Sequence, residues 1–176
     1  IGENLRIVNE YLSDCDDVIT RNFYMGQGGK HQMSLIFIDG MVKLDTVQND
    51  VLKPLMLFTR QFPLEYSVGE KFFNMVKEGL LTAGDIKEVD NFGELILGIL
   101  SGDTILLMDK LDKALIISTR GWEKRGVQEP STEAVIRGPR DGFTETYRTN
   151  VALVRRRLKD PNLKVKTIKL GRHTRT

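Results

Sequence analysis

The sequence contains a single cysteine and only two histidines among 176 residues. One cysteine excludes an internal disulfide, and Cys15 with His31 and His173 forms no spacing typical of a metal site. No stretch approaches the roughly 18 consecutive apolar residues that indicate a membrane-spanning helix. A secretory signal peptide is also absent, and the first residue is Ile1 rather than methionine. We therefore expect neither a disulfide framework nor a bound metal.

Motifs of enzymes are equally scarce. The run Gly26-Gln27-Gly28-Gly29-Lys30 suggests a phosphate-binding loop, but its spacing is too short and His31 stands where serine or threonine is required. A flexible hairpin loop is the interpretation that we favour. No nucleophile–base spacing and no cofactor fingerprint is present. We therefore expect a protein that is not an enzyme and that carries no cofactor.

Charge is divided unevenly along the chain. The net charge is +2, but residues 113–176 hold sixteen Lys/Arg and six Asp/Glu, so they carry +10 and residues 1–112 carry −8. A basic half predicts an anionic partner, which could be nucleic acid, lipid headgroups, or acidic surface of the same or a neighbouring subunit. Neutralisation inside the domain explains the asymmetry equally well.

Hydrophobic periodicity predicts alternating helices and strands, and hence an α/β fold. Apolar residues make up 40% of the chain and charged residues 28%, as in ordinary soluble globular proteins. We expect helices at residues 3–17, 45–56, 72–80 and 92–100, and strands at residues 18–25, 33–38, 104–108, 114–118 and 163–170. Asn91 and Glu94 have the spacing of a capping box at the start of the helix at 92–100. Pro54 is expected to kink or end the helix at 45–56.

The order of these elements suggests two small α/β lobes, each a mixed sheet packed with helices. Residues 1–80 would form the N-terminal lobe and residues 81–176 the C-terminal lobe. The boundary is expected near residues 68–90, which include an irregular stretch with glycine. In this arrangement the apolar strands at 33–38 and 104–108 belong to different sheets. A cleft between the lobes would suit a small polar molecule.

The stretch from Val135 to Pro161 is the most distinctive part of the chain. Gly138-Pro139 interrupts regular structure, and Asp141 is a suitable N-cap for a helix that ends before Pro161. One helical stripe follows and is expected to lie in the core: Phe143, Tyr147, Val151, Val154 and Leu158. The glycines at 138 and 142 would permit backbone angles that other residues avoid.

Basic residues surround this helix. Arg137 and Arg140 flank Gly138-Pro139 beside the expected helix N-terminus and could bind an anion. The other interpretation is pairing within the domain, because the acidic residues Glu133, Asp141 and Glu145 are close in sequence. The consecutive arginines 155–157 span nearly three quarters of a turn, so at least one should contact a neighbouring element, chain or lipid. Arg148 lies two turns before the first of them and could extend a basic ridge.

The string Ile136-Arg137-Gly138-Pro139-Arg140-Asp141-Gly142-Phe143-Thr144-Glu145 resembles the signature of the A subunits of bacterial spore germinant receptors, the GerA type. Further matches agree over most of the chain: Arg148-Thr149-Asn150, Leu153, Arg155-Arg156-Arg157, Asp160-Pro161, Ile36-Phe37-Ile38-Asp39-Gly40, Leu52-Lys53-Pro54-Leu55-Met56 and Gly98-Ile99-Leu100-Ser101-Gly102-Asp103. The resemblance implies a soluble N-terminal domain, excised from a subunit whose remainder is a bundle of membrane helices. The family signature names no catalytic residue.

The resemblance also implies a function. The subunit would act in nutrient-triggered germination at the spore inner membrane, together with B and C subunits. The domain would serve receptor assembly and signal transmission, with self-association, anionic lipid headgroups or a nutrient such as an amino acid or sugar as further contacts. The residues expected to carry this role are Arg137, Gly138, Pro139, Arg140, Asp141, Gly142, Phe143, Glu145, Arg148, Asn150, Arg155, Arg156 and Arg157.

A basic nucleic-acid- or anion-binding module is the alternative function. Its only support is the charge of the C-terminal half. Aromatic residues there are few, Phe143 and Tyr147 are expected to be buried, and no known nucleic-acid-binding motif is present. We therefore do not expect nucleic acid as the partner.

Overall fold

The computed structural model describes residues 1–25, 31–61, 69–121, 142–168 and 170. Within these ranges the strands form one five-stranded sheet in the order β1-β2-β4-β5-β3, and every pairing is antiparallel. The strands are β1 (Val18–Met25), β2 (His31–Ile38), β3 (Ile86–Val89), β4 (Thr104–Met108) and β5 (Ala114–Ile117). The predicted α/β class is confirmed.

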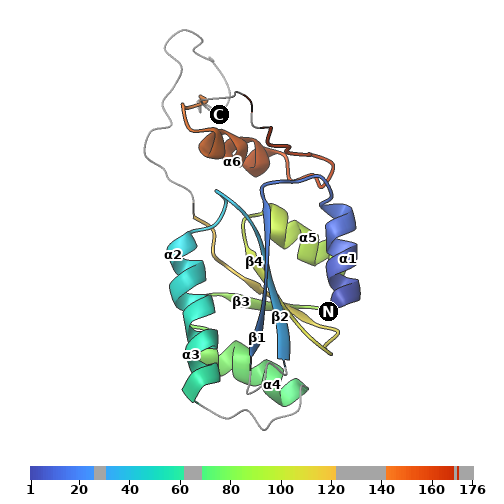
Figure 1. The fold of residues 1–176 in the computed structure, drawn as a ribbon, viewed down its shortest axis with the longest axis vertical. Helices are drawn as coiled ribbons and strands as arrows, with labels where there is room; N and C mark the ends of the chain where they lie inside the picture. Colours follow the sequence, from blue (N-terminus) through green and yellow to red (C-terminus); the bar gives the residue numbers. More distant parts are fainter. Residues whose placement is uncertain (26–30, 62–68, 122–141, 169, 171–176) are drawn as a thin grey trace.

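Helices cover both faces of the sheet (Figure 1). One face carries α1 (Gly2–Tyr11) and α5 (Phe92–Leu100). The other carries two longer helical stretches, each with a π-helical part: α2 (Leu44–Thr46), η1 (Val47–Leu52) and α3 (Lys53–Gln61), then α4 (Glu70–Asn74) and η2 (Met75–Leu80). Because successive side chains of a strand point to opposite faces, Leu35 and Phe37 of β2 pack on the second layer and Ile36 and Ile38 on the first. This double burial explains the continuously apolar run Leu35–Ile38 within β2.

The expectation of two sheets is wrong. Ile36 of β2 is paired with Ile105 of β4, so strands from both halves of the chain share one sheet. Chain before and after residue 80 therefore contributes to a common core. Local periodicity predicted four of the five strands, all but β3, but it could not indicate which strands would be neighbours, because that depends on contacts distant in sequence.

Two local predictions about helices have different outcomes. The N-cap at Asn91 is confirmed, since the backbone N–H of Glu94 donates to the Asn91 side chain at 2.9 Å and α5 begins at the next residue. The Glu94 carboxylate accepts from the side-chain amide of Asn91 at 3.4 Å instead of from its backbone N–H. Pro54 does not end its helix, which continues to Gln61. Proline has no N–H for the carbonyl of Asp50 four residues earlier, and that carbonyl accepts the N–H of Thr82 at 3.2 Å. The donor that proline lacks is thus supplied by Thr82, just after η2 in the same helical layer.

Candidate functional site

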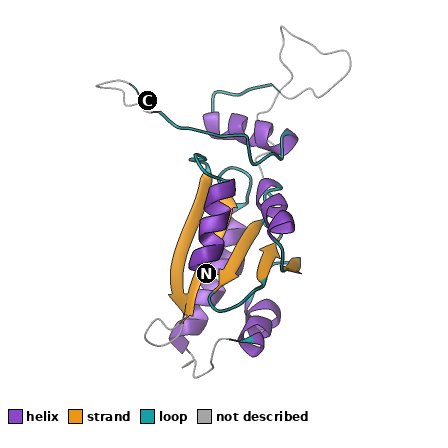
Figure 2. Cartoon of the chain, turned by 90° about the vertical axis from the view of Figure 1, so that its right-hand side faces the viewer, coloured by secondary structure: helices purple, strands orange, loops and turns teal. Residues whose placement is uncertain are grey.

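The last helix, α6 (Tyr147–Arg157), lies across the end of the sheet rather than on either face, as the side view in Figure 2 shows. Its buried residues are Ala152, Leu153 and Arg155. The helix begins after Thr146 and has no side-chain cap there. Asn150 instead folds the preceding segment onto the helix, because its carboxamide donates to the Thr144 carbonyl at 2.7 Å and accepts the Thr144 N–H at 2.6 Å. Asn150, one of the predicted site residues, therefore fixes how the chain enters α6.

A buried ion pair attaches α6 to the sheet. The Arg155 guanidinium donates from Nε and Nη2 to the two carboxylate oxygens of Asp17 at 2.8 and 2.9 Å. The Arg155 side chain has no exposed surface, and that of Asp17 is 8% exposed. Burial disfavours the charged form of Arg155 and by itself would lower its pKa. The hydrogen bonds to Asp17 favour the charged form, and the pKa of Arg155 is raised above its ordinary value. A bidentate arginine–carboxylate pair of this kind fixes both position and orientation.

A second ion pair lies two helical turns earlier. Nε of Arg148 contacts Oδ2 of Asp39 at 2.8 Å, and these side chains are 53% and 19% exposed. The two acidic partners are neighbours, because the N–H of Asp39 donates to the Asp17 carbonyl at 2.8 Å where β1 begins and β2 ends. Two arginines seven residues apart on one helix therefore meet two carboxylates at adjacent strand ends.

Gly40 allows the helix to approach the turn after β2. Its φ is +81°, a conformation that side-chain-bearing residues rarely adopt. A Cβ at this position would lie 3.1 Å from Cγ of Arg148, 3.3 Å from the Arg148 carbonyl oxygen and 3.6 Å from Cβ of Ala152. The Asp39-Gly40 pair thus provides both a charged contact for α6 and the space in which it sits.

The chain after α6 returns to the acidic loop before β1. Residues 163–168 were predicted as a strand, but no strand is formed there. They run extended instead, with the N–H of Asp16 donating to the Val165 carbonyl at 2.8 Å and the N–H of Thr167 donating to the Asp16 carboxylate at 2.6 Å. Nζ of Lys166 lies 3.1 Å from the Asp14 carboxylate. Together with the two pairs of α6, these contacts neutralise part of the basic half within the domain.

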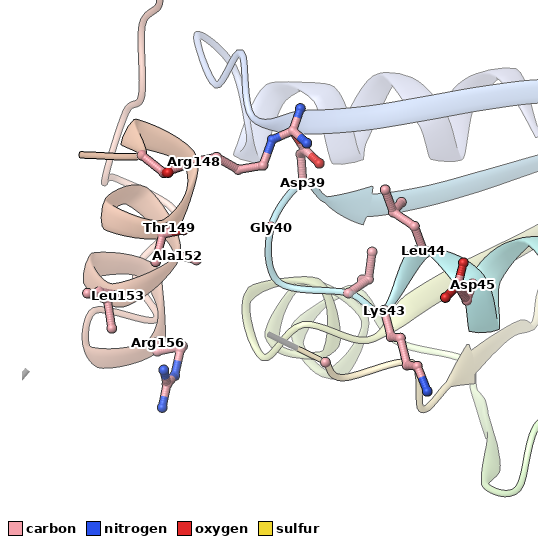
Figure 3. Close-up of a pocket in the computed structure, with 13 residues that line it drawn as sticks. Asp39, Gly40, Lys43, Leu44, Asp45, Arg148, Thr149, Ala152, Leu153 and Arg156 are labelled. Carbon is pink, nitrogen blue, oxygen red and sulfur yellow. The ribbon is translucent and has the colours of Figure 1, made fainter. Parts of the chain in front are cut away.

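A hollow of about 530 Å³ lies between α6 and the segment that follows β2 (Figure 3). Charged and polar groups of both signs line it: Asp39, Lys43, Asp45, Thr146, Arg148, Thr149 and Arg156. Arg148 reaches across to Asp39, whereas Lys43 and Arg156 extend toward the same side of the opening. Within the described part of the chain, neither Lys43 nor Asp45 has an ion-pair partner. The hollow therefore offers a cation and an anion that form no ion pair with another described side chain.

The predicted site residues have several outcomes. Arg137, Gly138, Pro139, Arg140 and Asp141 lie outside the described residues. Phe143 and Tyr147 were predicted in the core, but they are 74% and 65% exposed, and the helix begins at Tyr147 rather than after residue 141. Glu145 is exposed and Gly142 is half-buried. The prediction that the apolar stripe lies in the core is wrong, because α6 turns a different face toward the sheet.

The three consecutive arginines separate as their spacing predicted. Arg155 is buried against Asp17, Arg156 lines the hollow and Arg157 is exposed. Arg155, one of the residues expected to serve receptor assembly, is instead paired inside the domain. The partners Asp17 and Asp39 were not predicted as site residues. The only signal for them was position, since each is an aspartate that adjoins a strand end.

Among the described residues, no group of three or more histidine, cysteine or acidic side chains could hold a metal ion. No helix in these ranges has the length and apolar character needed to cross a membrane. The structure thus presents a helix fixed by charge beside a polar hollow.

Comparison with known proteins gives a consistent result. A sequence model described as Bacillus/Clostridium GerA spore germination protein matches residues 6–176. Spore germination protein KA of Bacillus subtilis is 32% identical over 176 residues, which are 100% of this chain and 31% of that protein. Spore germination protein A1 of the same organism is 32% identical over 181 residues, covering 97% of this chain and 33% of that protein. The chain thus spans about a third of the length of these curated relatives.

A solved structure has a similar fold. It is the crystal structure of the N-terminal domain of the A subunit of the Bacillus megaterium spore germinant receptor GerK3, with a TM-score of 0.74 and 24% identity. The match covers 98% of this chain and 60% of the solved chain. At this identity the likeness establishes the fold.

Proposed function

The chain belongs to the GerA family of Bacillus and Clostridium spore germination proteins, and from this premise we propose that it is the N-terminal domain of a germinant receptor A subunit. The receptor would act in nutrient-triggered germination, at the spore inner membrane and together with B and C subunits. Within it, the domain would serve assembly and signal transmission. Support for the role in germination comes from relatives that are named as spore germination proteins and match nearly all of this chain.

The observation that carries this proposal is the position of the hollow between two separately attached parts of the fold. One wall is α6, and the other is the segment Asp39–Lys43 that joins β2 to α2, together with the first two residues of α2. A molecule bound in the hollow would contact both walls at once. Binding there would therefore favour one position of α6 relative to the sheet over others, as a transmitted signal requires.

The charges of the hollow suit a small polar molecule that carries both signs. A carboxylate would be attracted to Lys43, and an ammonium group to Asp45. An amino acid has both groups, and a volume of about 530 Å³ lies in the range of ordinary small-molecule sites. We propose this class of nutrient as the ligand, and an uncharged sugar as the less suitable one.

Calorimetry of the domain with zwitterionic amino acids and with sugars tests the ligand. We expect heat of binding for at least one amino acid, and loss of that heat in Lys43→Met. Lys71→Met is the matched control, because Lys71 is exposed on α4 away from the hollow. Silence of the wild-type domain at millimolar concentration, or equal binding by the two variants, would argue against a ligand site at this place.

A test in spores addresses assembly and signalling. The variant is Arg156→Ala combined with Arg157→Ala, which leaves the buried Arg155 in place. We expect a melting temperature close to that of the wild type, together with less receptor in the spore membrane or slower germination. Normal receptor level and normal germination by a stably folded double variant would show that these arginines have no part in the receptor.

The basic nucleic-acid-binding alternative loses its main support in this structure. Four cations of the basic half are each paired with an aspartate of residues 1–112: Arg120, Arg148, Arg155 and Lys166. The charge asymmetry of the sequence is thus partly satisfied inside the domain. We accordingly keep the receptor domain as the single proposed function.

A further inference from the structure

The face of α6 that points away from the sheet is apolar and has no covering among the residues that the structure describes. Together with the extended chain that follows the helix it forms a shallow groove of about 250 Å³. We call this surface the α6 apolar face, and it consists of Phe143, Tyr147, Val151, Val154, Leu163 and Val165. Two of its members are large aromatic residues with most of their surface exposed, Phe143 at 74% and Tyr147 at 65%.

An apolar surface of this kind needs an explanation, because contiguous exposed apolar patches on soluble proteins mark places of contact. Its residues within the helix, Tyr147, Val151 and Val154, are spaced four and three residues apart, as on one apolar face of a helix that packs against another element. On the sheet side the helix uses Ala152, Leu153 and the Arg155–Asp17 pair. The opposite side of the helix is the apolar one, and no described residue covers it.

The length of the related proteins indicates what covers it. The solved N-terminal domain matches 98% of this chain, yet the match accounts for only 60% of that domain. That solved domain therefore includes substantial further polypeptide. The curated relatives are about three times as long as the present chain. A covering segment of the same subunit is thus available in proteins of this family.

We propose that the α6 apolar face is the docking surface for the remaining part of the subunit's own N-terminal domain. In this arrangement α6 lies between two layers. Its charged side is fixed to the sheet by Asp17 and Asp39, and its apolar side packs on an apolar surface of the following segment. This inference rests on family membership and on the exposed face. It does not depend on what the receptor senses or whether the hollow binds a ligand.

Cysteine reactivity compares the covered and uncovered states. Tyr147→Cys reports on the face, and Glu78→Cys, at an exposed position of η2, is the matched control. Both are made in a Cys15→Ser background, in the present chain and in the full-length subunit. In the present chain we expect both thiols to react with a maleimide at similar rates. In the full-length subunit we expect position 147 to react about tenfold or more slowly than position 78, the protection typical of a packed segment.

Equal rates at the two positions in the full-length subunit would overturn the proposal. Protection of the present chain that rises with its own concentration would also overturn it and assign the face to a second copy. Protection of the present chain by phospholipid vesicles would overturn it in favour of a membrane surface. Each of these outcomes leaves the ligand proposal unaffected, so failure of the two ideas can be distinguished.

A second variant tests the same surface by stability. Tyr147→Asp adds a charge to the face without removing a buried group. We expect the melting temperature of the present chain to stay nearly unchanged and the level of folded full-length subunit to fall severalfold. An unchanged level of full-length subunit would show that the face is not packed, even if the cysteine variants were uninformative.

Discussion

The buried pair between Arg155 and Asp17 should be the most sensitive attachment of α6. In Asp17→Asn the side chain keeps its shape but loses its charge. The amide oxygen can still accept one guanidinium hydrogen bond, whereas the amide nitrogen places a donor against a donor. A guanidinium with no exposed surface is then left without its counter-charge.

The magnitude follows from that burial. Removing one partner of a buried ion pair typically costs about 3–5 kcal/mol, because the remaining charge is uncompensated. For a domain of this size each kcal/mol lowers the melting temperature by roughly 2–4 °C, so we expect a decrease of about 6–20 °C. Thermal unfolding followed by circular dichroism measures it directly.

Lys166→Ala is the matched control. Lys166 pairs with Asp14 in the same region, but these side chains are 62% and 61% exposed. An exposed ion pair contributes about 1 kcal/mol or less, so the control should melt close to the wild type. If Asp17→Asn is no more destabilising than Lys166→Ala, the pair does not hold α6 and the reasoning is refuted.

A double variant separates the pair from other effects of residue 17. Combining Asp17→Asn with Arg155→Met removes both charges and leaves an apolar side chain in the buried site. Replacement of a whole buried pair by apolar groups is often nearly neutral. The double variant should therefore be more stable than Asp17→Asn alone, and a simple sum of the two single effects would contradict the coupling.

The remaining predictions concern Gly40 and the two sides of the fold. Gly40→Ala should destabilise the domain by about 1–2 kcal/mol because of the left-handed backbone at residue 40 alone. Gly79→Ala is the control: residue 79 lies in a helix, nothing is within 4 Å of its added Cβ, and the change should be neutral or stabilising by about 0.5–1 kcal/mol. Chemical denaturation measures the stability of both variants. Phe143→Ala should change the stability of the present chain by less than about 1 kcal/mol, because the side chain is 74% exposed, whereas Phe73→Ala, at 0% exposure, should cost about 3–5 kcal/mol. A large loss in Phe143→Ala would show that the aromatic ring is packed after all, and tolerance of Gly40→Ala would show that α6 does not need the close approach.

Much of the sheet could be predicted from local pattern. The strands at 18–25 and 33–38 and the hairpin of β4 and β5 follow from apolar runs and the polar turn between them. The helix after Asn91 follows from its cap. The short strand β3 was missed because its Lys87 and Glu88 reduce the apolar signal to two residues.

The attachment of α6 could not be predicted in the same way. Periodicity identified an apolar stripe and assigned it to the core, since a helix normally buries its apolar side. The structure buries the side that contains Arg155, because Asp17 supplies a matching carboxylate 138 residues earlier in the chain. Arginine is rarely buried unless it is paired, and the pattern around it gives no sign of where a partner lies. A buried charge thus overrode the local preference.

The two attachments of α6 differ in strength, and this difference has a mechanical consequence for the proposed signal. The Arg155–Asp17 pair is buried, whereas the Arg148–Asp39 pair, which lines the hollow, is largely exposed on the arginine side. To move an equilibrium between two positions of α6 from a ratio of about 1:99 to about 99:1, a ligand must bind one position about 5.5 kcal/mol more tightly than the other. That is demanding for a small ligand that must also break a buried ion pair. Displacing the exposed pair requires far less, because water already solvates much of Arg148. A ligand in the hollow would therefore move the N-terminal end of α6 while Arg155 holds the other end, so that the helix pivots. The residues at the moving end, Tyr147 and Val151, belong to the α6 apolar face. Such a pivot would pass directly to whatever segment is packed on that face.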